Sequence, residues 1–269
     1  MFIDKMFSLS GKVALVTGAA GSMGSAIATV YADAGADLLL VDIDGDGLCR
    51  LAKELERPGE RVRTFVGSVG DIQQITEAFE LLDREFGKID ILVNVAGPTK
   101  CSPPEEVNLA DVEYSMHHIA TARFFCCQQA GKRMLAAGKG SIISICSVTG
   151  VTANGRSHMA YSMAMAAAAQ MTRELSTEWS SRGVRVNAIA CGQITNKSLE
   201  QRMEEDPRLQ KNFLRGIPMG RMGTNEDIKG LALLLASDAS SFMTGALIPL
   251  DGGNLAKNAG GSHPGMPEF

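Results

Sequence analysis

Short apolar runs alternate with longer segments along this chain, and this alternation restricts its fold more than any other feature. We expect seven strands, each almost continuously apolar, at Val13 to Thr17, Leu38 to Asp42, Val62 to Val66, Ile89 to Asn94, Ser141 to Cys146, Val184 to Ile189 and Leu247 to Leu250. We expect helices between them at Gly24 to Ala34, Gly45 to Leu55, Ile72 to Phe86, Glu113 to Ala137, Tyr161 to Arg182 and Asn225 to Ala236. Strands that are apolar on both faces are typical of parallel sheets covered by crossover helices.

The connections between these segments are short and carry Gly, Asp or Asn, so no linker divides the chain. The sequence therefore predicts one α/β domain over residues 1–253, in which a doubly wound, seven-stranded parallel sheet carries helices on both faces. Residues 254–269 are rich in Gly and Pro, and we expect an extended tail there.

Composition excludes several classes of protein. The 269 residues carry a formal net charge of −4 without a basic stripe, so a nucleic-acid partner is not expected. The first residues lack the pattern of a secretory signal, and no apolar run reaches the roughly 18 residues of a membrane span. We therefore expect a cytoplasmic protein without membrane contact. The cysteines lack C-x-x-C spacing, so we expect no metal site and reduced, buried thiols at Cys49, Cys101, Cys126, Cys127, Cys146 and Cys191.

A glycine-rich turn, TGAAGSMG at Thr17 to Gly24, lies where the first strand passes into a helix. Glycines at such a turn let the backbone approach a pyrophosphate, whose negative charge is stabilised by the helix N-terminus. Taken alone, the same pattern also occurs in turns that are merely tight connections.

Asp42 strengthens the interpretation as a dinucleotide site, because it ends the second strand 18 positions after Gly24. An acidic side chain there accepts hydrogen bonds from the adenosine ribose hydroxyls. Its carboxylate also repels a 2′-phosphate, so the sequence favours NAD(H) over NADP(H). The alternative is that Asp42 only caps the following turn.

Several ordered segments together resemble the short-chain dehydrogenase/reductase family, which has a Rossmann fold. TGAAGSMG is similar to its T-G-x-x-x-G-x-G motif, and NVAG at Asn94 to Gly97 is similar to its N-N-A-G. SIISICSVTG at Ser141 to Gly150 resembles its serine strand, and Tyr161 follows 14 residues after Ser147. RGVRVNAIACG, GRMGTNEDI and SFMTGALIPLDGG resemble its C-terminal portion, so the likeness covers about residues 9 to 253.

The resemblance implies a role for each matching position. Ser147 would hydrogen-bond the substrate oxygen, and Tyr161 would pass a proton between that oxygen and solvent while a hydride moves to or from nicotinamide. By analogy the subunits would pair into a homotetramer through the helix around Arg123 to Gln129 and the one from Ala164 to Trp179. The cofactor site would comprise Gly18, Ser22, Met23, Gly24, Asp42, Ile43, Ser68, Val69, Asn94, Ala96, Gly97, Tyr161, Gly192, Ile194 and Thr195.

Met165 is the gravest departure from the family pattern, because the family reads Tyr-x-x-x-Lys and this chain reads YSMAM. A unit charge 4 Å from the phenolate contributes about 4 kcal/mol at an effective dielectric of about 20. Without that charge, we expect Tyr161 to titrate near the phenol value of about 10. Two interpretations stay open: a natural methionine that marks altered or absent redox chemistry, or a lysine replaced deliberately to trap a ligand.

Other departures are milder. Ser22 replaces a glycine of the phosphate turn, Val95 an asparagine, and Cys191 a proline, while Ser68 lies where an aspartate usually holds the adenine amine. The family's helix asparagine, which supports the lysine through a water, aligns at or beside His118. We expect His118 either to contribute to a proton path or to fill a niche between helices.

The loop from Val148 to Met159 would border a small-molecule substrate. Its Asn154, Arg156 and His158 suit a hydroxylated or carboxylated molecule such as a sugar acid, a polyol or a hydroxy acid. Residues 195–221 would form a mobile lid.

Two functions therefore compete. The first is an NAD(H)-dependent oxidoreductase that interconverts a secondary alcohol and a ketone, in an active or a Met165-inactivated form. The second is a non-redox protein on the same scaffold, either a lyase or dehalogenase or a nucleotide-sensing module.

Overall fold

Seven parallel strands form a single sheet in the order β3-β2-β1-β4-β5-β6-β7 in the computed structural model. The structure describes residues 2–57, 59, 61–98, 100–155, 157–257, 262, 264 and 266. The strands are β1 (Val13–Thr17), β2 (Asp37–Asp42), β3 (Val62–Val66), β4 (Ile91–Asn94), β5 (Gly140–Ser147), β6 (Val184–Cys191) and β7 (Leu247–Leu250). This confirms the predicted doubly wound parallel sheet, and the seven predicted strands lie within three residues of the observed ones.

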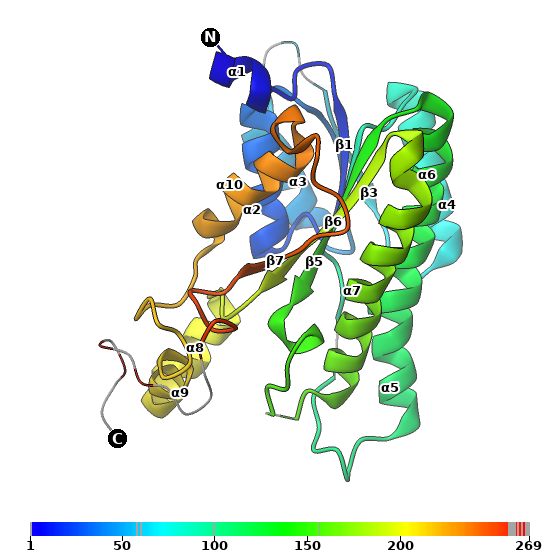
Figure 1. Ribbon diagram of the computed structural model, residues 1–269. Coiled ribbons are helices and arrows are strands. Elements are labelled where there is room, and N and C mark those ends of the chain that lie inside the picture. Colours follow the sequence, from blue (N-terminus) through cyan, green and yellow to red (C-terminus); the bar gives the residue numbers. More distant parts are fainter. Residues whose placement is uncertain are drawn as a thin grey trace.

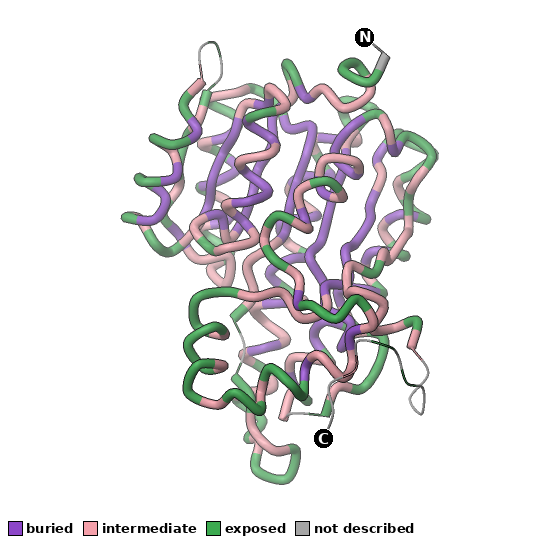
Figure 2. The backbone as a smooth tube through the Cα atoms, turned by 90° about the vertical axis from the view of Figure 1, so that its left-hand side faces the viewer, coloured by how far each residue is buried: buried purple, intermediate pink, exposed green. Residues whose placement is uncertain are grey.

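Helices cover both faces of the sheet (Figure 1). One face carries α2 (Ser22–Asp33), α3 (Gly45–Leu55) and α10 (Asn225–Ala236), and the other carries α4 (Ile72–Phe86), α6 (Ala122–Ala137) and α7 (Met159–Trp179). Side chains along β1 alternate between the two layers, because Ala14 and Val16 pack toward α2 while Val13 and Leu15 pack toward α4. The buried strands form the centre of the molecule (Figure 2).

The remaining elements are short. They are α1 (Phe2–Phe7), α5 (Leu109–Ser115), a π-helical turn η1 (Met116–Thr121), the 3₁₀ turns η2 (Val148–Gly150), η3 (Ser180–Arg182) and η4 (Asp238–Ser240), and the helices α8 (Lys197–Glu205) and α9 (Pro207–Leu214). The single helix expected from Glu113 to Ala137 is therefore three consecutive pieces. Sequence analysis missed α8 and α9, which lie within the expected lid.

Local side chains set the helix starts. Asp44 and Asp71 accept hydrogen bonds from the first backbone N–H groups of α3 and α4. Asn196 does the same for α8, and Asp206 for α9, which has Pro207 in its first turn. Such caps satisfy N–H groups that have no partner within the helix, and each typically stabilises it by about 1 kcal/mol.

Two expectations about burial were wrong. β3 is exposed along much of its length, because it is the edge strand and its sequence VRTFV alternates. Cys49 and Cys101 are exposed, whereas the other four cysteines are buried free thiols. Lys257 and Asn254 bond to backbone oxygens after α9, and most of the predicted tail lies outside the described residues.

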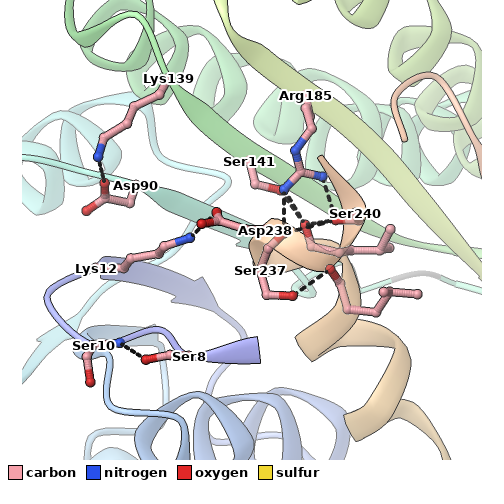
Figure 3. Close-up of polar contacts among 12 residues, drawn as sticks. Ser8, Ser10, Lys12, Asp90, Lys139, Ser141, Arg185, Ser237, Asp238 and Ser240 are labelled. Carbon is pink, nitrogen blue, oxygen red and sulfur yellow. Dashed lines mark hydrogen bonds and ion pairs between the residues drawn. The ribbon is translucent and has the colours of Figure 1, made fainter. Parts of the chain in front are cut away.

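Charged residues close the sheet at the amino ends of the strands (Figure 3). Asp90 accepts a hydrogen bond from the backbone N–H of Val13 and pairs with Lys139, while Lys12 pairs with Asp238. Arg185 donates to Ser240 and to backbone oxygens at the end of α10. These contacts tie the strand starts together and leave the opposite edge open for binding.

A substitution at Gly183 tests how closely the chain packs where β5 and β6 begin. Its φ is +84°, and a Cβ there would overlap the carbonyl oxygen of Gly138. We expect Gly183→Ala to lower the free energy of unfolding by about 2 kcal/mol or more, measured by urea denaturation. Gly230→Ala is the matched control, because the exposed Gly230 in α10 has open space around it and should gain about 0.5–1 kcal/mol. Equal effects of the two substitutions would contradict the role given to Gly183.

Candidate active site

The glycine-rich turn joins β1 to α2 in a conformation that depends on its glycines. Gly18 has a φ of +66°, and a Cβ on Gly24 would overlap the carbonyl oxygen of Gly18. The backbone of this turn lines a cavity, and no side chain among the described residues caps the start of α2 at Ser22, so its first N–H groups are left for a ligand. This arrangement is suited to a pyrophosphate.

Asp42 at the end of β2 is held by two backbone N–H groups. One oxygen of its carboxylate accepts from Ala20 at 3.0 Å and the other from Asp44 at 3.1 Å. Because a carboxylate has about four acceptor positions, capacity remains for further donors such as ribose hydroxyls. Asp42 thus caps the turns on both sides of it and also faces a cavity.

This cavity of about 460 Å³ lies at the carboxyl ends of β1, β2, β3 and β4, where the strand order reverses. Parallel α/β sheets bind ligands at this point. Ten of the fifteen residues expected to hold the cofactor line it: Gly18, Ser22, Met23, Gly24, Asp42, Ile43, Ser68, Val69, Ala96 and Gly97. Its described walls contain no Lys or Arg. The residues present therefore fit a dinucleotide and give no cation for a 2′-phosphate.

The other expected cofactor residues lie elsewhere. Asn94 is buried and donates to Cys127 Sγ at 3.4 Å, and its Oδ1 has no partner in the described part of the chain. Thr195 donates its backbone N–H to Gly223. Ile194 lines a separate small pocket, while Gly192 and Tyr161 line the neighbouring large one. Their part in cofactor binding stays a prediction.

Ser147 and Tyr161 are brought together from β5 and α7. Ser147 Oγ accepts hydrogen bonds from the backbone N–H of Thr149 at 3.2 Å and from Thr149 Oγ1 at 3.0 Å. Because both acceptor positions of its hydroxyl are used by Thr149, Ser147 retains its own proton to donate, and its hydroxyl makes a hydrogen bond with Tyr161. The predicted pair therefore converges in space.

The pKa of Tyr161 is raised, mainly because burial disfavours the charged phenolate. The hydrogen bond from Ser147 and the charge of Arg123 both lower it, and thus oppose that effect. Cys191, which also faces Tyr161, has a pKa raised to about 12 by burial, so its thiol is neutral.

Ser147 and Tyr161 line a second cavity of about 580 Å³. Asn154 and His158, both expected to border the substrate, line this cavity. The centroid of the His158 ring lies 6.0 Å from that of the Tyr161 ring. Arg156 lies outside the described residues. Asn196 lines this cavity and the dinucleotide cavity, so the two adjoin.

Sequence analysis missed several residues of this second cavity, notably Thr149, Gln193 and Arg202. Arg202 comes from α8, which packs with α9 on a small apolar cluster around Phe213. The segment that contains Arg202 was expected to form the lid, but its secondary structure was not predicted. The helical pattern of residues 197–205 was the signal that would have placed Arg202 on one face of a helix.

His118 and Met165, which were singled out near the expected catalytic pair, have different surroundings. His118 lies in the π-helical turn, its Nδ1 is 2.9 Å from the Tyr114 carbonyl oxygen, and it lines the dinucleotide cavity. It does not line the cavity that holds Ser147 and Tyr161. Met165 is buried in an apolar cluster with Ile119. Whether His118 takes part in catalysis stays a prediction.

Arg123 is a further site residue that sequence analysis did not find. Its helix is one of those expected to pair subunits, but the Arg123 side chain is only 2% exposed. The guanidinium instead lies inside the chain, where Nη1 donates to the Ile145 carbonyl oxygen at 2.7 Å. A single arginine in a long amphipathic segment gave no signal of this orientation.

Comparison with known proteins agrees with this geometry. The family described as Enoyl-(Acyl carrier protein) reductase matches residues 18–254. A D-threitol dehydrogenase of Mycolicibacterium smegmatis is 37% identical over 95% of this chain and 97% of its own length. A gluconate 5-dehydrogenase of Gluconobacter oxydans is 33% identical, over 92% of this chain and 96% of its own length.

Solved structures are also similar. A short-chain type dehydrogenase/reductase from Mycobacterium marinum has a TM-score of 0.86 and 31% identity, covering 94% of this chain and 99% of that one. This chain belongs to the short-chain dehydrogenase/reductase family. It is an oxidoreductase, as its relatives are, so the non-redox alternative is set aside.

Solved relatives hold a nicotinamide dinucleotide. A structure from Beutenbergia cavernae, with 35% identity and a TM-score of 0.87 over 93% of this chain and 99% of that one, contains NADP at low occupancy. A 7α-hydroxysteroid dehydrogenase, with 28% identity and a TM-score of 0.87 over 93% of this chain and 96% of that one, is complexed with NADH. The family cofactor is thus NAD(P).

Neither a membrane-spanning helix nor a metal-binding cluster is present in the described part of the chain. No helix there has the length and apolar character needed to cross a bilayer. The described residues also contain no cluster of His, Cys, Asp and Glu suited to a metal ion.

Asp42 gives a direct test of the choice between cofactors. Asp42→Asn keeps the shape of the side chain but removes its charge, so we expect NADH to bind about tenfold more weakly and NADPH to bind better than before. Fluorescence titration with both nucleotides measures this. Asp46→Asn, an exposed change outside the cavity, should leave both affinities unaltered. If the unmodified protein bound NADPH as tightly as NADH, the assignment of Asp42 would be wrong.

Proposed function

We propose that this oxidoreductase uses NAD(H) and interconverts a secondary alcohol and a ketone on a polyol or sugar acid. The observation that carries the proposal is the convergence of Ser147 and Tyr161 on a polar cavity that adjoins the dinucleotide cavity. Asp42 and the lack of cations in the described walls support NAD(H). Small polyol and sugar-acid substrates are those of the two named relatives.

The chain's own residues account for the proton. In alcohol oxidation, Ser147 and Tyr161 hydrogen-bond the substrate hydroxyl, and the Tyr161 phenolate accepts its proton. The donated hydrogen bonds from Thr149 fix the Ser147 hydroxyl so that its proton faces the reacting oxygen. A bound nicotinamide supplies the hydride acceptor for oxidation and the hydride donor for reduction.

The second cavity determines the substrate class. Its described lining includes several hydrogen-bonding side chains, among them Asn154, Gln193 and Asn196, which suit a hydroxylated chain. Arg202 provides one cation, which suits the carboxylate of a sugar acid. A carboxylate at one end and a hydroxyl at the Ser147–Tyr161 end would fix the orientation of such a substrate.

Tyr161→Phe tests the reaction. Removal of the phenolic oxygen should lower kcat by about 10² to 10⁴, because proton transfer then has no positioned group. NADH absorbance assays with D-threitol, galactitol and gluconate measure turnover, and NADH fluorescence should show binding within a fewfold of the unmodified protein. Tyr31→Phe is the control, since Tyr31 bonds to the Ala232 carbonyl oxygen between α2 and α10 and lines neither cavity. Binding of NADH with no turnover of any polyol, hydroxy acid or sugar acid would refute the proposed substrate class.

We also propose a homotetramer, assembled in part through α6 and α7. Phe124 on α6 and Met163 on α7 are 45% and 47% exposed in the isolated chain. Large apolar side chains on neighbouring helices favour a subunit contact.

Phe124→Glu should therefore reduce the assembly to smaller species, because each two-fold contact would bury two added charges. Light scattering after size exclusion measures the mass. Ile72→Glu, on an exposed apolar residue of α4, is the control and should leave the mass unchanged. A monomeric unmodified protein would contradict the tetramer.

A further inference from the structure

Arg123 is a buried cation whose partners in the described part of the chain are not carboxylates. Nη1 donates to Ile145 O, and Nη2 lies 3.3 Å from Ala96 O and 3.4 Å from Val95 O. Nε has no hydrogen-bond partner among the described residues. A buried charge without a countercharge is costly, so an arginine at this position calls for a functional reason.

The guanidinium lies against the residue that departs most from the family pattern. Nη1 is 3.9 Å from Met165 Sδ and 4.0 Å from Cys146 Sγ. Cys146 precedes Ser147 on β5, and Met165 follows Tyr161 by one turn of α7. The charge of Arg123 therefore sits between the two elements that carry the catalytic pair.

Resting on the proposed function, we propose that Arg123 supplies, from α6, the buried positive charge beside the active-site tyrosine that Met165 cannot supply from α7. Arg123 is thus a positioning residue that acts on Tyr161 and does not line either cavity. Its carbonyl partners Val95 and Ala96 belong to the segment that ends β4 and borders the dinucleotide cavity, so they hold the guanidinium in place from the cofactor side.

The surroundings suit this arrangement. Ile119, Met165 and Ala168 form an apolar cluster beside the guanidinium, and low polarity strengthens the effect of a charge on a nearby phenol. The stem of a lysine at position 165 would follow that of Met165 past Nη1, and its ammonium would lie two bonds beyond the place of the present Sδ, so two cations would share this buried region and repel each other. The methionine is therefore compatible with Arg123, and this supports the interpretation of Met165 as a natural residue.

Arg123 is the only cation among the groups that face Tyr161 in the described chain. The others are Ser147 and Cys146 from β5, Cys191 from β6 and the His158 ring at the start of α7. The hydrogen bond from Ser147 and the charge of Arg123 lower the pKa of Tyr161, whereas burial and the two cysteines raise it. Removal of Arg123 should therefore leave only one group that favours the phenolate.

A titration without substrate or cofactor tests the proposal independently of the proposed function. The chain has three tyrosines, so the ultraviolet titration of each variant minus that of its Tyr161→Phe counterpart isolates the Tyr161 phenol. Arg123→Met should raise the pKa of Tyr161 by about one unit or more. At any fixed pH well below that pKa, the phenolate fraction would then fall about tenfold. Arg123→Lys, which keeps the charge, should recover most of this shift.

Kinetics give the second readout. Alcohol oxidation requires the phenolate, so kcat should rise with pH through the Tyr161 pKa, and Arg123→Met should move this rise to higher pH. At pH 8 its kcat with D-threitol, galactitol or gluconate should fall about tenfold or more. The double variant Arg123→Met/Met165→Lys should return both the profile and the phenol titration close to those of the unmodified enzyme. Met165→Lys alone should melt at lower temperature than the double variant.

Three results would overturn the proposal. One is an unshifted phenol titration in folded Arg123→Met, and another is an equal loss of kcat at every pH, as a purely structural role predicts. The third is a Met165→Lys variant that matches the double variant in melting temperature and pH profile. If Arg123→Met does not fold, the double variant decides: folding with a near-normal Tyr161 titration supports the proposal, and either failure refutes it.

Discussion

The parallel alignment of the strands is the constraint on which the rest of the structure depends. Because crossover helices return every strand in the same direction, the carboxyl ends of all strands meet at one edge of the sheet. This brings together residues that are far apart in the sequence: the glycine-rich turn after β1, Asp42 at the end of β2 and Ser147 at the end of β5. Charged pairs such as Lys12–Asp238 occupy the opposite edge, so binding and stability are separated in space.

Within the site, burial and charge oppose each other at Tyr161. In the proposed reaction, burial would keep water from the reacting oxygen, but it also disfavours the phenolate that would accept the proton. The structure counters that cost with the hydroxyl of Ser147, fixed by Thr149, and with the charge of Arg123. The two contributions come from different elements, since Ser147 belongs to β5 and Arg123 to α6.

The packing around Met165 shows how one position depends on others. Met165 is buried with Ile119, and its sulfur contacts the Arg123 guanidinium. Under the proposed role of Arg123, an apolar side chain at position 165 avoids the repulsion that a second nearby cation would bring. Substitutions at positions 165 and 123 are therefore coupled, and the effect of either depends on the residue at the other.

The sequence by itself determined the order and type of most elements, because apolar runs such as Val13–Thr17 and caps such as Asp71 act locally. It also determined the glycine-rich turn, Asp42 and the Ser147–Tyr161 pair, whose spacings resemble a known family. It did not determine which side of a long helix faces inward, so the burial of Arg123 was not foreseen and Arg202 was missed. Only the tertiary structure decided that a guanidinium on α6 lies beside a methionine on α7, since the contact joins residues 42 positions apart and arises from how two helices pack on one sheet.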